Sequence, residues 1–343
     1  MTLLAFESSC DETSVAVVRD GVVLSNQVAS QIQLHGEYGG VVPELAAREH
    51  LKNLLPVARA ALAAAGVSPA ELDAVAATQG PGLSIALLIG LKAAQSVAFS
   101  LAKPFIGINH HEAHLYSPWI AGQPPAADFS AFEPNVSLIV SGGHTLLVLV
   151  SAELQHRVLG GTIDDAAGEC FDKTGKLMGL PYPAGPVMDE LAQGGNPAAF
   201  DFPRPLLHDA SDDFSFSGLK TSVRYYLRDH PGLLDDPQKV RDLCASVQAA
   251  IVEVLVTKTI RAARRNGVGC VTASGGVTCN QGLRQALERA CEKNGLRLRL
   301  AARKLCTDNA AMIGVLAARK LLQGGVGLDL ALDAEPEPGW ELA

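Results

Sequence analysis

The spacing of apolar and polar residues along the chain predicts a mixed α/β protein. Short apolar runs bounded by turn residues indicate strands, and longer runs with helical periodicity indicate helices. In the first third of the sequence the predicted strands are 3–7, 14–18, 22–29, 73–78 and 105–108, and the predicted helices are about 43–66 and 83–102. Three consecutive strands are therefore followed by alternating helices and strands.

The same order begins again after residues 121–127, which have the composition of a linker. A strand at 135–140, a glycine-rich turn and a strand at 146–150 repeat the opening hairpin, and a further strand is predicted at 269–273. The fold class is therefore α/β, with two duplicated ribonuclease-H-like domains of the actin, Hsp70 and sugar-kinase (ASKHA) class and an interdomain cleft. We expect the lobes to span 1–125 and 126–328, with a flexible tail at 329–343. The final helix, about 307–323, could pack back on the first lobe.

Composition agrees with a well-packed protein outside the membrane. The 343 residues are 48% hydrophobic and 19% charged, and 33 are glycine. The N-terminus lacks the basic and apolar segments of a signal peptide, and polar residues interrupt the longest apolar run, 83–102, so we expect no membrane segment and a cytoplasmic location. The seven cysteines include no C-x-x-C pair, which favours reduced thiols and leaves histidine and carboxylate as the expected metal ligands.

Charge is distributed unevenly. The net charge is -8, yet residues 257–304 contain eleven Lys or Arg against two Glu. This basic segment is either a face for a phosphate backbone or the solvated outer side of two helices, and the sequence leaves both open.

A histidine-rich segment follows the strand at 105–108. Asn109 is a good N-cap, so His110 and His114 lie one turn apart on the same helix face and form a candidate metal-ligand pair. The positive end of the helix should keep both rings neutral. A polar helix face that merely contains two histidines is the alternative. The H-E-x-x-H motif of zinc proteases is excluded, because Leu115 stands where its second histidine is required.

Carboxylates elsewhere are candidates for binding. Asp308 precedes an apolar helix and is either its N-cap or a metal ligand. A helix predicted over 162–179 carries acidic residues that either form the pairs Glu169–Lys173 and Asp172–Lys176 or face the cleft. The turn at 182–186 and Asp189 could complete a sugar site. The first turn, residues 8–13, can hold a phosphate, with Asp11 available for a cation or hydroxyl.

Taken together, these turns resemble the TsaD/Gcp/YgjD family, whose members make N6-threonylcarbamoyladenosine in tRNA. The matching motifs occur in the family's order from residue 4 to about 314. They are Phe6–Ser14, Tyr38–Glu44, Gly80–Leu83, Asn109–His114, Val140–Thr145, Phe171–Thr174, Phe214–Thr221, Ser274–Val277 and Cys306–Ala311. Ser8 and Ala184 depart from the residues common in the family.

The resemblance implies a set of site residues. His110, His114 and Asp308 would bind one divalent metal, Fe²⁺ or else Zn²⁺, and two histidines with one carboxylate also suit such ions chemically. Asp11 and Glu12 would act in catalysis or position substrate. The substrate-binding positions implied are Ile139, Val140, Ser141, Gly142, Gly143, Asp172, Gly185, Asp189 and Asn280.

The activity implied is transfer of threonylcarbamoyl from L-threonylcarbamoyl-AMP to N6 of adenosine 37, in tRNAs that read codons beginning with adenine. Implied partners are tRNA, a TsaB-like paralogue and a TsaE-like ATPase, with a TsaC-like enzyme supplying the adenylate. Two alternatives remain from the residues alone. A small-molecule kinase or ATPase of the same fold would not need the histidine pair, and a non-catalytic scaffold would have no metal site.

Overall fold

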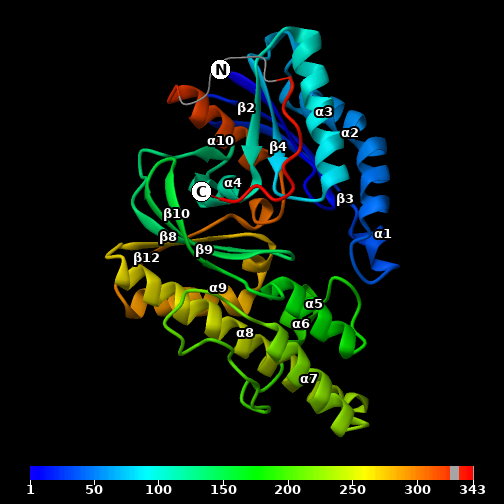
Figure 1. Ribbon diagram of the computed structural model, residues 1–343, viewed down its shortest axis with the longest axis vertical. Helices are drawn as coiled ribbons and strands as arrows, with labels where there is room; N and C mark the ends of the chain where they lie inside the picture. Colours follow the sequence, from blue (N-terminus) through cyan, green and yellow to red (C-terminus); the bar gives the residue numbers. More distant parts are fainter. Residues whose placement is uncertain (325–331, 343) are drawn as a thin grey trace. The chain divides into compact units, whose positions relative to one another are not determined.

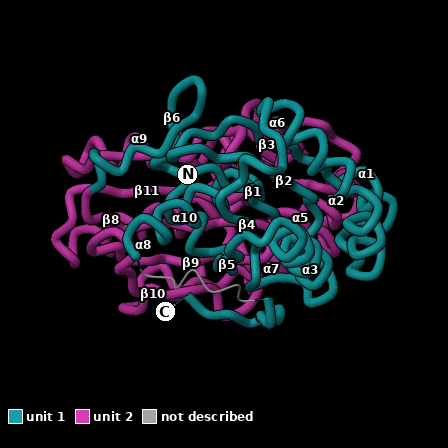
Figure 2. The backbone as a smooth tube through the Cα atoms, turned by 90° about the horizontal axis from the view of Figure 1, so that it is seen from above, with its two compact units in different colours: residues 1–132, 307–343 teal, residues 133–306 magenta. Residues whose placement is uncertain are grey.

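The computed structural model describes residues 1–324 and 332–342 (Figure 1). The chain divides into two compact units, coloured separately in Figure 2: unit 1 is Met1–Phe132 with Thr307–Ala343, and unit 2 is Glu133–Cys306. Composition placed the end of the first lobe at residue 125, whereas unit 1 continues to Phe132. The reason is that the strand Ala126–Ala127 pairs with Val22 of the first sheet.

Unit 1 is built on a seven-stranded sheet with helices along it. Its strands, in the order β5-β4-β1-β2-β3-β7-β6, are β1 Thr2–Glu7, β2 Glu12–Arg19, β3 Val22–Ser30, β4 Ala74–Gly80, β5 Phe105–Asn109, β6 Ile120–Ala121 and β7 Ala126–Ala127. Its α-helices are α1 Ile32–Gly36, α2 Pro43–Ala65, α3 Ser84–Leu101, α4 His110–Tyr116 and α10 Ala310–Leu322.

Helices cover both faces of this sheet, which explains why β1 is buried at all six positions. Leu4 and Phe6 belong to the core that α2 and α3 close. Because side chains alternate across a strand, Ala5 points the other way, and there α10 packs over β1 and β2. The end of β1 and the start of α4 are thus held inside a packed layer.

Unit 2 has a five-stranded sheet in the order β10-β9-β8-β11-β12. Its strands are β8 Asn135–Val140, β9 Thr145–Ala152, β10 Gln155–Gly161, β11 Cys270–Ser274 and β12 Arg297–Leu300. Its α-helices are α5 Ala167–Leu177, α6 Ala184–Ala192, α7 Ser217–Asp229, α8 Pro237–Arg265 and α9 Gln281–Lys293. The long helix α8 contributes much of the buried core.

The two sheets share one topology, which confirms the predicted fold class. In each, three consecutive strands pair antiparallel, and the first of them then pairs parallel with the fourth strand of the unit. The predicted strands and the helix through Pro56 are present. The helix expected from residue 162 begins only at Ala167. Thr162 instead bridges to Phe214, and Asp164 accepts hydrogen bonds from the start of α7.

The C-terminal segment packs on unit 1. Its amide at Glu337 donates to the carbonyl of Gln79, the amide of Gly82 donates to Pro338, and Asn109 donates to the carbonyl of Trp340. Polar, proline-rich composition predicted a flexible tail at 329–343. Of that range, 332–342 is described and hydrogen-bonded along β4 and α3, while 329–331 and 343 lie outside the described residues.

Two helices, α3 and α8, are long and apolar enough to cross a bilayer by length and composition. Core helices of soluble proteins meet the same criterion, and 83% of the apolar window of α8 is buried in unit 2. For α3 the buried share is 39%, so this helix exposes apolar side chains.

The close contact between α10 and the sheet gives a stability prediction. A Cβ at Gly314 would lie 2.7 Å from Cγ2 of Val18 and 3.1 Å from Cβ of Ala5, both held in the buried sheet. Gly314→Ala should therefore lower the free energy of unfolding by about 1–2 kcal/mol, despite alanine's better helix propensity. Gly218→Ala on α7 is the control, because its Cβ would find its nearest neighbour at 3.9 Å. Urea denaturation should give a lower free energy of unfolding for Gly314→Ala than for the wild type, and an unchanged or higher one for Gly218→Ala.

Candidate functional site

The histidine helix α4 forms as the sequence predicted. Asn109 caps it, since its side-chain oxygen accepts a hydrogen bond from the amide of Glu112 at 3.1 Å. His110 and His114 lie on the same face with ring centroids 4.8 Å apart, and both are buried. Two neighbouring imidazoles are thus presented on a short helix in the interior of unit 1.

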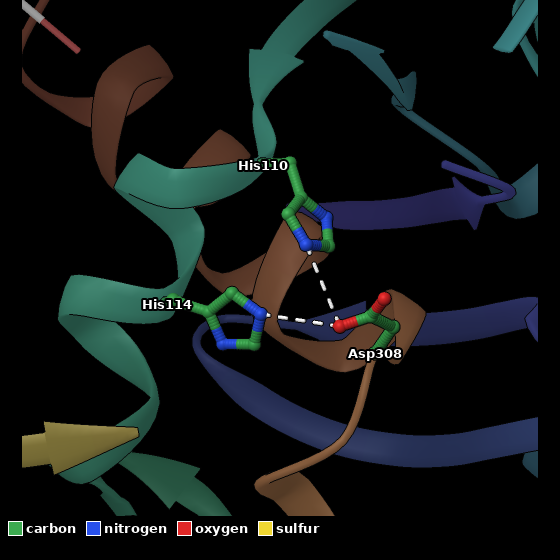
Figure 3. A group of neighbouring side chains, drawn as sticks. All are labelled: His110, His114 and Asp308. Atoms are coloured by element: carbon green, nitrogen blue, oxygen red, sulfur yellow. Dashed lines mark hydrogen bonds and ion pairs between the residues drawn. The ribbon is translucent and has the colours of Figure 1, made fainter. Parts of the chain in front are cut away.

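Asp308 joins this pair from the other end of the sequence. Asn309, not Asp308, is the N-cap of α10, because its side chain accepts from the amide of Met312. The Oδ1 atom of Asp308 lies 3.4 Å from Nε2 of His110 and 3.2 Å from Nε2 of His114 (Figure 3). The question that the sequence left open is settled against the cap, and all three predicted ligands meet in one unit.

These three groups fit a metal ion. Their ligand atoms all lie within 4.8 Å of one another. Two ligands about 2.1 Å from one ion and about 100° apart would be about 3.2 Å from each other, close to the separations of Asp308 from His110 and His114. Two histidines and one carboxylate also leave positions free for substrate, as in Fe(II) and catalytic zinc sites.

Glu7 orients the first histidine and was not among the predicted site residues. Its Oε2 atom accepts from Nδ1 of His110 at 3.0 Å, and its carboxylate also accepts from the Ser9 amide and the Thr78 hydroxyl. With Nδ1 engaged in this way, Nε2 of His110 is the nitrogen that faces Asp308. Glu7 ends a buried strand, and a carboxylate at that position was the only sequence signal for its role.

The electrostatics differ between the two imidazoles. Burial acts to lower the pKa of His110, but the carboxylates of Asp308 and Glu7 outweigh it and raise that pKa well above its usual value. Burial lowers the pKa of His114. The expectation that both rings are neutral is therefore correct for His114 and wrong for His110. Metal binding would have to displace the proton from His110.

The pKa of Asp308 is shifted in the opposite direction from that of His110. Burial alone would raise the pKa of Asp308, yet the neighbouring imidazoles hold it well below its usual range. Asp308 is therefore ionised, as a metal ligand must be.

Asp11 and Glu12 follow β1 in the same unit. Glu12 begins β2, and the Ser30 hydroxyl donates to its Oε1 at 3.4 Å. Burial, followed by the negative charges of Asp11 and Asp308, raises the pKa of Glu12 well above its usual value. A carboxyl group with a raised pKa is suited to proton transfer, although its part in catalysis stays a prediction.

The remaining predicted site residues belong to unit 2. Ile139 and Val140 are buried at the end of β8, and Ser141–Gly143 form the turn into β9, where Ser141 and His144 exchange two hydrogen bonds. No neighbour lies within 4 Å of a Cβ at Gly142 or Gly143. The turn therefore offers its backbone to a ligand.

The side chains predicted to surround an adenylate accept hydrogen bonds from amides at the N-termini of helices in this structure. Asp172 accepts from the amides of Ala184 and Gly185, and Asp189 accepts from the amides of Gln281 and Gly282. Asn280 caps α9 through the amide of Leu283. These contacts fix the turns in place, and ribose binding by the same carboxylates stays a prediction.

Much of the basic segment is used inside unit 2. Lys258 is fully buried, and at least seven of the eleven basic side chains have internal partners. The pairs are Lys258 with the Ser211 carbonyl, Arg261 with the Asp209 and Ser211 carbonyls, Arg264 with the Asn294 side chain, Arg265 with Asp212, Arg284 with the Thr278 and Ala301 carbonyls, Arg297 with Glu133, and Arg303 with the Cys279 carbonyl. High local charge in the sequence is thus not the same as a free basic surface.

Comparison with known proteins shows the family of the chain. Residues 22–315 match the family model TsaD, described as tRNA N6-adenosine threonylcarbamoyltransferase. A relative of that name from Geotalea uraniireducens is 52% identical over 92% of this chain and 90% of its own length. Another from Trichlorobacter lovleyi is 50% identical over 97% and 95%.

Solved structures support the fold. HypF from T. kodakarensis matches with a TM-score of 0.61 at 14% identity, over 96% of this chain and 49% of that one. Component A of the Acidaminococcus fermentans (R)-2-hydroxyglutaryl-CoA dehydratase matches with a TM-score of 0.52 at 15% identity, over 93% and 97%. At these identities the likeness concerns the fold alone.

The Glu7–His110 contact predicts an effect on metal affinity. Glu7→Gln should weaken binding of Zn²⁺ or anaerobic Fe²⁺ about 10–100-fold, because the ring loses its charged partner. Glu112→Gln is the matched control, since Glu112 is also buried but pairs with Lys320 away from the cluster. Calorimetric titration of both folded variants would measure this, and equal affinities would contradict an orienting role for Glu7.

Proposed function

We propose that His110, His114 and Asp308 bind the metal ion of a tRNA N6-adenosine threonylcarbamoyltransferase, since the chain belongs to that family. The protein is a transferase that modifies N6 of adenosine in tRNA. The observation that supports the metal proposal is one carboxylate oxygen placed between two buried imidazoles. Fe²⁺ is the ion we expect, with Zn²⁺ as the alternative, because this ligand set suits both.

The reaction we propose is acyl transfer from L-threonylcarbamoyl-AMP. The N6 amine of adenosine 37 attacks the carbamoyl carbon, the bond from that carbon to the phosphate oxygen breaks, AMP leaves, and the amine gives up one proton. When bound, the metal would polarise the reacting carbonyl and orient the donor. Glu12 is our candidate proton acceptor because its pKa is raised, and Asp11 beside it would position substrate.

Turns of this chain would bind the L-threonylcarbamoyl-AMP donor, partly through their own main-chain groups. We assign Ile139–Gly143 to the substrate segment, where the exposed glycines let a ligand approach the main chain. Asp172, Gly185, Asp189 and Asn280 are assigned to the adenylate. The chemistry of the two carboxylates supports this, because each can accept hydrogen bonds from the ribose hydroxyls of the adenylate.

An exposed apolar surface supports the proposed TsaB-like partner. Adjacent helices α2 and α3 expose large apolar side chains, with Leu51 74% and Phe99 72% exposed, together with Leu55, Ile85 and Leu88. Such a surface is typical of a protein contact. The TsaE-like ATPase, the TsaC-like enzyme and a cytoplasmic location remain expectations from the family resemblance.

The metal proposal predicts that a variant can lose metal binding without unfolding. His110→Ala should lose the metal and abolish tRNA modification while the protein stays folded. His111→Gln is the control, because His111 lies on the same helix but outside the cluster. Metal content, thermal melting and modification with supplied L-threonylcarbamoyl-AMP should be measured together. Full activity of a metal-free His110→Ala protein would refute the role of the metal.

The partner proposal is tested on α2. Leu51→Glu with Leu55→Glu should abolish co-sedimentation with a purified TsaB-like subunit, because two charges would enter the apolar contact. Leu322→Glu is the control, since this leucine is 69% exposed on α10 of the same unit. If the double variant still binds as tightly as the wild type, the partner docks elsewhere.

A further inference from the structure

A hollow of about 350 Å³ lies along α5 and α7 in unit 2, and four of its six lining residues are Lys or Arg. Its lining residues are Lys173, Lys176 and Leu177 of α5 and Lys220, Thr221 and Arg224 of α7. The two helices pack against each other, so their basic side chains converge although they are more than 40 residues apart in the sequence.

The charges around this hollow are only partly compensated. Asp165 forms ion pairs with Lys173 at 2.9 Å and with Lys220 at 2.7 Å, and Glu169 pairs with Lys173 at 2.6 Å. Among the described residues, neither Lys176 nor Arg224 has an ion-pair partner. Four cations thus face two carboxylates, and the two unpaired cations lie on opposite helices. Among the described residues the lining of the hollow therefore carries an excess of positive charge, which suits an anionic ligand.

We propose that this hollow binds backbone phosphates of the tRNA substrate. The inference rests on the proposed function, which makes tRNA a substrate of this chain. Both unpaired cations are exposed, and Lys173 and Lys220 keep 41% and 30% of their side chains exposed. Exposed cations spread over two helices suit an extended polyanion better than a small anion, which would be enclosed by its donors.

The outer face of α7 also carries a basic side chain, which lies against an exposed aromatic ring. Tyr225 is 51% exposed, and the guanidinium of Arg228 lies 4.8 Å from the centre of its ring. Basic side chains interleaved with an exposed aromatic ring are typical of surfaces that bind nucleic acid. Arg228 also pairs with Asp229, so its charge is partly compensated, unlike that of Arg224 one turn earlier.

The position of α5 connects the hollow to the proposed substrate segment. The amide of Gly168, in the first turn of α5, donates to the carbonyl of Ser141 at 3.2 Å. Lys173 and Lys176 follow five and eight residues later, about 8 and 12 Å along the helix axis. A tRNA strand whose adenosine reacts with a donor bound at the Ser141–Gly143 turn would therefore have its neighbouring phosphates within reach of the hollow.

Lys176→Ala with Arg224→Ala is the sharpest variant, because removing these two cations leaves no carboxylate unpaired. The matched control is Arg289→Ala with Lys293→Ala on α9, which removes two exposed cations that also have no ion-pair partner among the described residues. Binding of unmodified tRNA to the metal-loaded protein is measured by fluorescence anisotropy across a range of salt concentrations. Thermal melting checks that both variants are folded.

We expect the α5–α7 variant to bind tRNA several-fold more weakly than the wild type. The slope of log affinity against log salt should become shallower by about 2, one for each lost phosphate contact. The control should keep the wild-type slope. Equal losses in both variants would show an effect of net charge alone, and an unchanged slope in the α5–α7 variant would show no contact. Either result would overturn the proposal.

A second experiment distinguishes tRNA phosphates from a free phosphate compound. Pyrophosphate is titrated against the wild type and the α5–α7 variant at constant ionic strength. Tight pyrophosphate binding that is lost in the variant, with tRNA affinity unchanged, would assign the hollow to a small ligand and overturn the proposal. Failure of the proposed function is separately visible, because the wild-type protein would then not modify tRNA at all.

Discussion

The placement of the Asp308 carboxylate between two imidazoles is the interaction on which the site depends. His110 and His114 are neighbours through helix spacing alone, whereas Asp308 is the second residue after the chain returns to unit 1. Its position is fixed by the packing of α10 on β1 and β2. The close approach of Gly314 to the side chains of Val18 and Ala5 allows this packing, which holds α10 and the residues just before it against the sheet.

Burying two carboxylates in this region is costly unless their charge is matched. Glu7 is fully buried and Asp308 keeps only 19% of its side chain exposed, and each ionised acid in such a place costs several kcal/mol by itself. In the metal-free chain a proton on His110 supplies part of the compensation. A divalent cation with neutral imidazoles would balance both acids, so the electrostatics and the donor set favour the same ligand.

Local sequence rules predicted the local parts of this site. The Asn109 cap, the histidine spacing and the positions of the strands along the sequence follow from interactions within a few residues, and the family resemblance added Asp308. Glu7 was missed because its partner is 103 residues away and its strand reads only as apolar. The helix start at Ala167 was missed because Thr162 and Asp164 are held by the distant segment around Phe214. Tertiary contacts decided each of these features.

The same limit applies to charge. Counting Lys and Arg along the sequence measures how many cations are present, but the fold determines how many remain free. Lys258 and Arg261 satisfy carbonyl groups of the loop at 209–211, so their charge stabilises unit 2. Lys176 and Arg224 are inconspicuous in the sequence, yet helix packing brings them to one hollow without partners among the described residues. A protein with a net charge of -8 can therefore hold a polyanion wherever its fold leaves a few cations uncompensated.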